Sequence, residues 1–159
     1  MVTERVSFSD GQGREQRVAA YGVCTRDDPL TSEHQLLLVR LNDRTTTPGA
    51  WMLPGGGIEF GEQPADAVVR EVEEETGYRV AIDELLTVVS VQRVIHRKNL
   101  DQPINYHAIR VIYRVNVVSG ELRYETDNST DEAAWCHAAD LDRMRLTDVA
   151  IQARTLANI

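Results

Sequence analysis

Residues 55–77 constrain this chain more than any other segment, because three glycines are followed by a pattern that predicts one amphipathic helix. Pro64 suits the first helical position, since its missing N–H would have no partner there. Gly77 lies where a left-handed residue commonly ends a helix. The expected buried stripe consists of residues at helical spacing, namely Val68, Val69, Val72 and Thr76. Most acidic residues of the segment are therefore expected on the opposite side.

Three of those acids, Glu71, Glu74 and Glu75, fall within an arc of about 100° when the segment is read as a helix. Like charges three or four residues apart destabilise a helix by roughly 0.2–0.5 kcal/mol per pair. A sequence that concentrates carboxylates in this way either presents a solvated face or binds a cation. The two interpretations predict different functions, and residues outside the helix decide between them.

The rest of the chain predicts strands on both sides of this helix and a second helix near the end. The dense apolar run 36–39 indicates a strand buried on both faces. The expected strands span 17–25, 34–41, 85–95, 106–118, a segment that starts at 121, and 134–137, and the final helix starts near Thr147. This order predicts an α/β chain, in which helices pack on the faces of a mixed sheet. The length suits a single domain spanning 1–159.

Composition narrows the function. The net charge of −8 argues against binding polymeric nucleic acid, whose phosphates attract a basic surface. No apolar run approaches the ~20 residues of a membrane span, and residues 1–5 lead into no secretory signal, so a cytoplasmic protein is expected. Cys24 and Cys136 lie in apolar, strand-like stretches and are expected to be reduced and buried. The long strands after the helix offer an edge that leaves a homodimer open.

Residues 56–78 follow the pattern G-x5-E-x7-R-E-V-x-E-E-x-G-Y, which resembles the signature of the Nudix (MutT-like) hydrolases. This segment is called the Nudix box below. The defining residues are Gly56, Glu62, Arg70, Glu71, Glu74, Glu75 and Gly77. At background frequencies of roughly 5–7% per residue type, an accidental match at one register has a probability of about 10⁻⁸ to 10⁻⁹. Tyr78 departs mildly, since an aliphatic residue is usual there. The resemblance implies an α/β/α sandwich with a central mixed sheet and the Nudix helix on one face.

The resemblance also implies a divalent-metal site. It makes Glu74 and Glu75 the principal metal ligands, the Gly55 carbonyl a further ligand, and Glu71 either a ligand or the general base. Oxygen ligands suit Mg²⁺ (or Mn²⁺), which makes water nucleophilic and neutralises charge on phosphate oxygens. Glycine allows the backbone to approach the metal and the phosphate closely, where a Cβ would collide.

Arg70 is expected among the catalytic residues as their organiser. It either reaches back to Glu62 and clamps the glycine loop to the helix, or forms a surface pair with Glu74 worth about 0.3–0.5 kcal/mol. Outside the box, Glu132 is the expected additional metal ligand or base, with an exposed acidic hairpin as the alternative. Guanidinium groups bind phosphate bidentately, so arginines on the predicted strands are the expected substrate-binding residues. They are Arg40, Arg93 and Arg110.

The box and its implied metal predict a pyrophosphohydrolase that cleaves the diphosphate linkage of a nucleoside diphosphate linked to another moiety. The expected partner is therefore a small phosphorylated nucleotide. The alternative is a non-catalytic Nudix domain that binds or senses a nucleotide. Such domains often lose box carboxylates, and this chain has all of them. A third interpretation is an acidic interaction helix without a metal.

Overall fold

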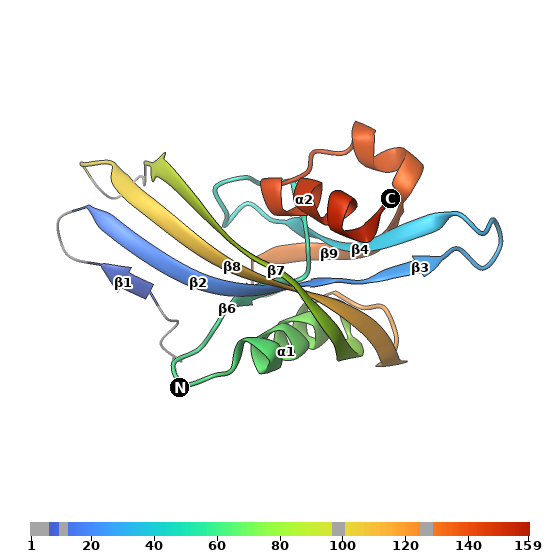
Figure 1. The fold of residues 1–159 in the computed structure, drawn as a ribbon. Helices are drawn as coiled ribbons and strands as arrows, with labels where there is room; N and C mark the ends of the chain where they lie inside the picture. The colour runs from blue at the N-terminus through green and yellow to red at the C-terminus, as the bar shows by residue number, and fades with distance from the viewer. Residues whose placement is uncertain (1–6, 10–12, 97–100, 125–128) are drawn as a thin grey trace.

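The computed structural model describes residues 7–9, 13–96, 101–124 and 129–159. Strands form a central layer, with helix α1 on one side and helix α2 on the other (Figure 1). The elements in chain order are β1 (Ser7–Ser9), β2 (Arg14–Val23), β3 (Thr25–Asp27), β4 (His34–Leu41), β5 (Trp51–Met52), β6 (Gly55–Gly57), α1 (Pro64–Thr76), β7 (Tyr78–Ile95), β8 (Ile104–Gly120), β9 (Thr130–His137), the 3₁₀ helix η1 (Ala138–Arg143) and α2 (Asp148–Ala157).

The strands form two sheets that meet in this layer. In the first sheet, β2 lies between β1 and the parallel strand β8, β7 forms the edge, and β6 also pairs with β2. In the second sheet, β4 pairs with β3, β5 and β9. The Leu37 N–H donates to the Cys24 carbonyl, and the Gly22 N–H donates to the Pro54 carbonyl, both at 2.9 Å. These hydrogen bonds join the two sheets.

Each helix covers its own side of the layer. Val68 and Val72 of α1 pack with Ala20 of β2 in one core cluster. The other cluster contains residues of α2, β2 and β4, including Val149, Ala150, Ala153, Tyr21, Leu36 and Leu38. Successive strand residues point to opposite faces, so Ala20 and Tyr21 belong to different clusters. The expected α/β/α sandwich with a mixed sheet is confirmed. None of the described helices is long and apolar enough to cross a membrane.

Helix α1 begins and ends where the sequence predicts. Gly77 has a left-handed conformation with φ of 75°, and its N–H donates to the Glu73 carbonyl at 2.9 Å. The expected placement of the acids holds for Asp66, Glu73 and Glu74 but was wrong for the other two. Glu71 and Glu75 are only 4% and 2% exposed, on the same buried side as Val72. Gly56 of β6 makes room for the carboxylate of Glu71, because it has no side chain.

The strands differ from the prediction mainly in length. β7 begins at Tyr78, directly after α1, and the predicted strand from 121 is absent from the described residues 121–124. There the Arg123 N–H donates to the Thr76 carbonyl at 2.9 Å, which ties the segment to the end of α1. Residues 55–57, expected as a loop, form a strand because they pair with β2. The two cysteines are free and buried, as predicted.

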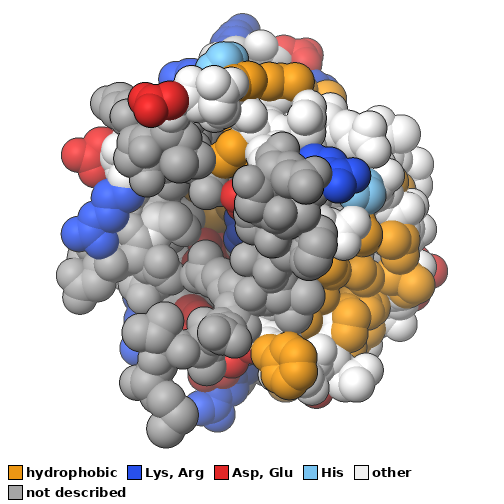
Figure 2. All heavy atoms as spheres, turned by 90° about the vertical axis from the view of Figure 1, so that its left-hand side faces the viewer, with side chains coloured by type: hydrophobic (Ala, Val, Ile, Leu, Met, Phe, Trp, Pro, Cys, Tyr) orange, Lys and Arg blue, Asp and Glu red, His pale blue; other side chains and the backbone are white. Residues whose placement is uncertain are grey.

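Figure 2 views the end of the molecule where β2 and β8 begin. Hydrophobic side chains gather on one side of this end. The edge strand β7 has three exposed large hydrophobic residues, Leu85, Val88 and Val94. A cavity of about 720 Å³ at the strand ends is lined by residues 14–16, 92–94 and 105–107. This volume lies within the range of roughly 300–1,000 Å³ that is typical of small-molecule sites.

Gly77→Ala is expected to destabilise the chain by about 2 kcal/mol more than Gly61→Ala. Both glycines have left-handed backbones, with φ of 75° and 81°. A Cβ at Gly61 meets nothing within 4 Å, whereas one at Gly77 collides with Arg123 Cγ and lies 2.5 Å from the Glu121 carbonyl oxygen. Urea unfolding of both variants measures the difference. Equal losses would show that only the backbone conformation matters at Gly77.

Candidate active site

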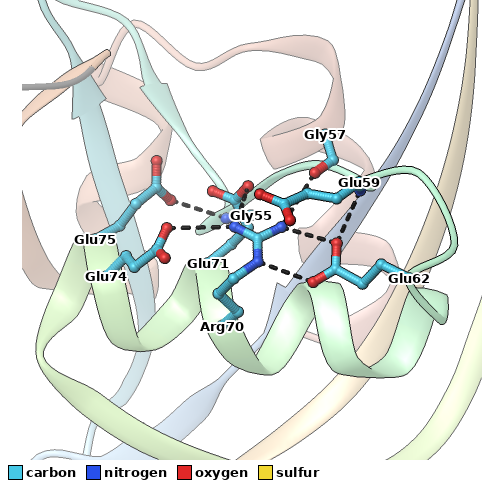
Figure 3. Close-up of polar contacts among 8 residues, drawn as sticks. All are labelled: Gly55, Gly57, Glu59, Glu62, Arg70, Glu71, Glu74 and Glu75. Carbon is cyan, nitrogen blue, oxygen red and sulfur yellow. Dashed lines mark hydrogen bonds and ion pairs between the residues drawn. The ribbon is translucent and has the colours of Figure 1, made fainter. Parts of the chain in front are cut away.

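Arg70 connects β6, called the glycine strand, with helix α1 and the turn that precedes it (Figure 3). Its guanidinium donates to both carboxylate oxygens of Glu62, from Nε at 2.8 Å and from Nη2 at 2.9 Å. Its Nη1 donates to Glu71 at 2.9 Å and to Glu74 at 3.3 Å. The Gly57 carbonyl accepts from Nη2 at 3.3 Å. The expected clamp on Glu62 is therefore present, and the pair with Glu74 exists beside it.

The hydrogen bonds between Arg70 and Glu62 shift the pKa of both groups. Hydrogen bonding to Glu62 raises the pKa of Arg70, although burial opposes the change. The Arg70 hydrogen bond lowers the pKa of Glu62, again against the effect of burial. Glu62 also accepts the Glu59 N–H at 2.8 Å. One ionised carboxylate thus fixes both Arg70 and the turn that leads into α1.

The two buried carboxylates of α1 face the glycines of β6. Glu75 accepts the Gly55 N–H at 2.9 Å. A Cβ on Gly56 would lie 2.6 Å from the carboxyl carbon and both oxygens of Glu71, so that position accommodates the carboxylate only while it is glycine. Gly55 has φ of 143°, and a Cβ there would lie 2.7 Å from the Cα of Tyr21. Packing therefore holds backbone and carboxylate oxygens together.

The carboxylates of α1 and the backbone carbonyl of Gly55 are suitable ligands for a hard divalent cation. All are oxygen atoms, which Mg²⁺ prefers, and the space above Gly56 holds one carboxylate against the strand. As the side chains stand, no three His, Cys, Asp or Glu residues of the described part converge into a metal site. Arg70 and the Gly55 N–H engage Glu71 and Glu75 instead. Each carboxylate retains further lone pairs that a metal ion could engage.

The candidates outside the box form two groups on different sheets. On β4 and β9, Arg40 pairs with Glu132 at 2.6 Å. Arg40 also pairs with Asp131 at 2.8 Å. On β7 and β8, Arg93 and Arg110 share the carboxylate of one α2 residue, Asp148, at 2.6 and 3.1 Å. The structure thus brings Arg40 to Glu132 and Arg93 to Arg110.

Sequence reasoning missed Arg17, Tyr21 and Asp148. Burial lowers the pKa of Arg17, but the surrounding Tyr21, Tyr106 and Glu71 outweigh it and leave the pKa raised. Arg17 and Tyr21 are therefore near the acids of α1. The even spacing of these two residues in β2 was the available signal, since it places both side chains on one face. Asp148 gave no signal, because it contacts β7 and β8 only in the folded chain.

The chain resembles known proteins in both sequence and fold. A family model for the NUDIX domain matches residues 15–159. The chain belongs to the Nudix family. The solved structure of a MutT Nudix hydrolase from Burkholderia pseudomallei is 29% identical, with a TM-score of 0.66, and the match covers 91% of this chain and 98% of that one.

Two curated Nudix relatives have narrower names. An ADP-ribose pyrophosphatase from Methanocaldococcus jannaschii is 30% identical over 116 residues, which cover 72% of this chain and 62% of that protein. Diphosphoinositol polyphosphate phosphohydrolase 2 from Homo sapiens is 36% identical over 88 residues, covering 55% and 44%. The chain spans 28% to 62% of the length of the first curated relatives that it matches. These names specify different substrates, so family membership alone does not identify the substrate of this chain.

Within the Nudix box, Glu62→Gln is expected to lower the free energy of unfolding by about 2 kcal/mol near neutral pH, because it removes the charged hydrogen bonds to Arg70. Since folding depresses the pKa of Glu62 below its ordinary value of 4.5, this stability is present above pH 4.5 and lost as the pH falls through the folded-state pKa. The gap between wild type and variant should therefore close in acid. Urea unfolding at several pH values measures it.

The control for this variant is Asp66→Asn, which removes an exposed carboxylate from the first turn of α1. It is expected to change stability by less than about 1 kcal/mol at neutral pH. A gap between wild type and Glu62→Gln that stays constant from neutral pH to strong acid would show that the ionised clamp is not the cause.

Proposed function

We propose that this Nudix chain is a divalent-metal-dependent pyrophosphohydrolase that cleaves the diphosphate linkage of a nucleoside diphosphate linked to another moiety. The observation that carries the proposal is the burial of two carboxylates, Glu71 and Glu75, against the glycine strand β6. Buried carboxylates are costly unless they are paired or bind a cation. The relative named ADP-ribose pyrophosphatase supports the class of substrate.

In this proposal, Glu74, Glu75 and the Gly55 carbonyl hold Mg²⁺ or Mn²⁺. A metal ion held there would make water nucleophilic and neutralise charge on the diphosphate. Glu71 is a further ligand or the general base. Arg70 orients Glu71 and Glu74 through hydrogen bonds from Nη1, and its bidentate bond to Glu62 keeps that nitrogen in place.

The residues outside the box bind the substrate or assist the metal in this proposal. Arg93 and Arg110 bind substrate phosphate from the first sheet. Arg40 has the same role on β4, and Glu132 is an additional metal ligand or base. Either role requires the Arg40–Glu132 pair to open, because the two groups neutralise each other at 2.6 Å.

The test combines the purified chain and Mg²⁺ with a panel of diphosphate compounds, and measures the phosphomonoesters released. The panel contains ADP-ribose, nucleotide sugars, dinucleoside polyphosphates, NADH and a diphosphoinositol polyphosphate. We expect Mg²⁺-dependent cleavage of at least one nucleoside diphosphate compound and none in EDTA. Binding without cleavage would indicate a nucleotide sensor. Cleavage of the inositol compound alone would contradict the nucleotide class.

A further inference from the structure

Several arginines lie on the sheet face that α2 covers, outside the Nudix box. Arg17 and Tyr21 point to the same face of β2, and Tyr21 packs in the core cluster that contains α2. The strand register places Arg110 on that face of β8 and Arg93 on that face of β7. Arg17, Arg93 and Arg110 are called the arginine cluster below.

One carboxylate pairs with two members of the cluster. Oδ2 of Asp148 pairs with Arg93 Nη2 at 2.6 Å and with Arg110 Nη1 at 3.1 Å. The Arg110 side chain is only 10% exposed, whereas that of Asp148 is 47% exposed. Asp148 can therefore rotate into water, but Arg110 stays buried and needs an anion beside it. Another anion of suitable size can take the place of Asp148.

Arg17 links the cluster to the Nudix helix. Its guanidinium is hydrogen-bonded to Tyr106 and is close enough to Glu71 for that charge to act on it. Tyr21 is likewise close to Arg17, Arg110 and Glu75. Arg93 and Tyr106 also line the cavity of about 720 Å³ at the strand ends. A substrate whose diphosphate lies beside Glu71 can therefore extend along the cluster toward that cavity.

We propose that the arginine cluster is a second anion-binding subsite, which takes a phosphate group of the substrate beyond the diphosphate that is cleaved. The inference rests on the proposed function and narrows its substrate class. Arg17, Arg93 and Arg110 share this part of the face with Glu15 and Asp148, and farther along it Arg114 pairs with Glu84. Guanidinium groups bind phosphate bidentately. Asp148 acts as the internal counter-ion that the phosphate replaces.

Inorganic phosphate is the probe, titrated by calorimetry into the full metal-free chain in EDTA. Asp148→Asn removes the competing carboxylate and is expected to bind phosphate about 10-fold more tightly than wild type. Arg17→Gln and Arg93→Gln are each expected to bind it about 10-fold more weakly.

Two control variants remove one carboxylate and one guanidinium group outside the arginine cluster. Asp140→Asn and Arg79→Gln affect exposed ion pairs, Asp140 with Arg143 and Arg79 with Glu73, and should bind phosphate as wild type does. Unchanged or weaker binding by Asp148→Asn would overturn the counter-ion role. Binding by Arg17→Gln equal to that of Arg79→Gln would overturn the subsite.

A second arm compares ADP-ribose with its 2′-phosphate in the presence of Mg²⁺. Wild type is expected to have a lower KM for the phosphorylated compound. Arg17→Gln should remove most of that preference, whereas the control Arg79→Gln should retain it. Equal KM values in wild type would contradict the assignment of the subsite to a substrate phosphate. Cleavage of neither compound would count against the hydrolase function, while the metal-free titration would still test the subsite.

Discussion

Glu75→Gln is expected to lower the hydrolysis rate at least about 100-fold while the chain stays folded. The change removes the charge of a proposed metal ligand. The new amide keeps an oxygen at the position that accepts the Gly55 N–H, so the contact between α1 and β6 persists. Steady-state kinetics on the best substrate of the panel measures the loss. Thermal unfolding followed by circular dichroism verifies the fold.

The matched control is Glu73→Gln, the same substitution on the same helix. Glu73 accepts a hydrogen bond from Arg79, whose side chain is 71% exposed, and an exposed pair of this kind contributes little to stability. The hydrolysis rate of Glu73→Gln should stay within about two-fold of wild type. A two-fold change corresponds to ~0.4 kcal/mol in activation free energy. Full activity in Glu75→Gln would remove Glu75 from the set of ligands.

Gly56→Ala is expected to weaken Mn²⁺ binding at least about 10-fold and to reduce activity by about 100-fold. The added Cβ would lie 2.6 Å from the carboxylate of Glu71, which must rotate away. Because this carboxylate is the end of a flexible side chain, the fold should lose less than about 2 kcal/mol. Calorimetry with Mn²⁺ and urea unfolding measure the two effects separately.

Gly22→Ala is the control that separates local displacement from general loss of stability. Its Cβ would lie 3.1 to 3.3 Å from the side chains of Val115, Val72 and Val68, which overpacks the core beneath α1. Overpacking of this kind costs about 1–3 kcal/mol. Mn²⁺ affinity should nevertheless match wild type. If Gly56→Ala binds Mn²⁺ as tightly as Gly22→Ala does, the space above Gly56 has no part in the metal site.

Local signals account for what the sequence predicted correctly. The bounds of α1 follow from Pro64 and Gly77, whose backbone preferences act within one turn. The Arg70–Glu62 clamp was predictable because the two residues are eight apart and belong to one motif. The strand 34–41 follows from its continuous apolar run, which is buried almost throughout.

Long-range contacts explain what the sequence did not predict. Glu71 and Glu75 were expected on the side of α1 opposite its apolar stripe, because carboxylates are rarely buried. Contacts with the adjacent glycine strand accommodate them on the buried side instead. The first residues of β7 were missed because register irregularities interrupt the alternation there. Arg17 and Asp148 are distant in the sequence, and only the packing of α2 onto the sheet brings them near a common face.

Calorimetric titration of Mn²⁺ tests the central claim, that the acids of α1 form a metal site, most directly. It compares wild type, Glu73→Gln and a triple variant in which Glu71, Glu74 and Glu75 are all replaced by Gln. We expect Mn²⁺ binding by wild type and Glu73→Gln, and none by a folded triple variant. Equal Mn²⁺ affinity in the triple variant and wild type, or no binding by wild type, would contradict it.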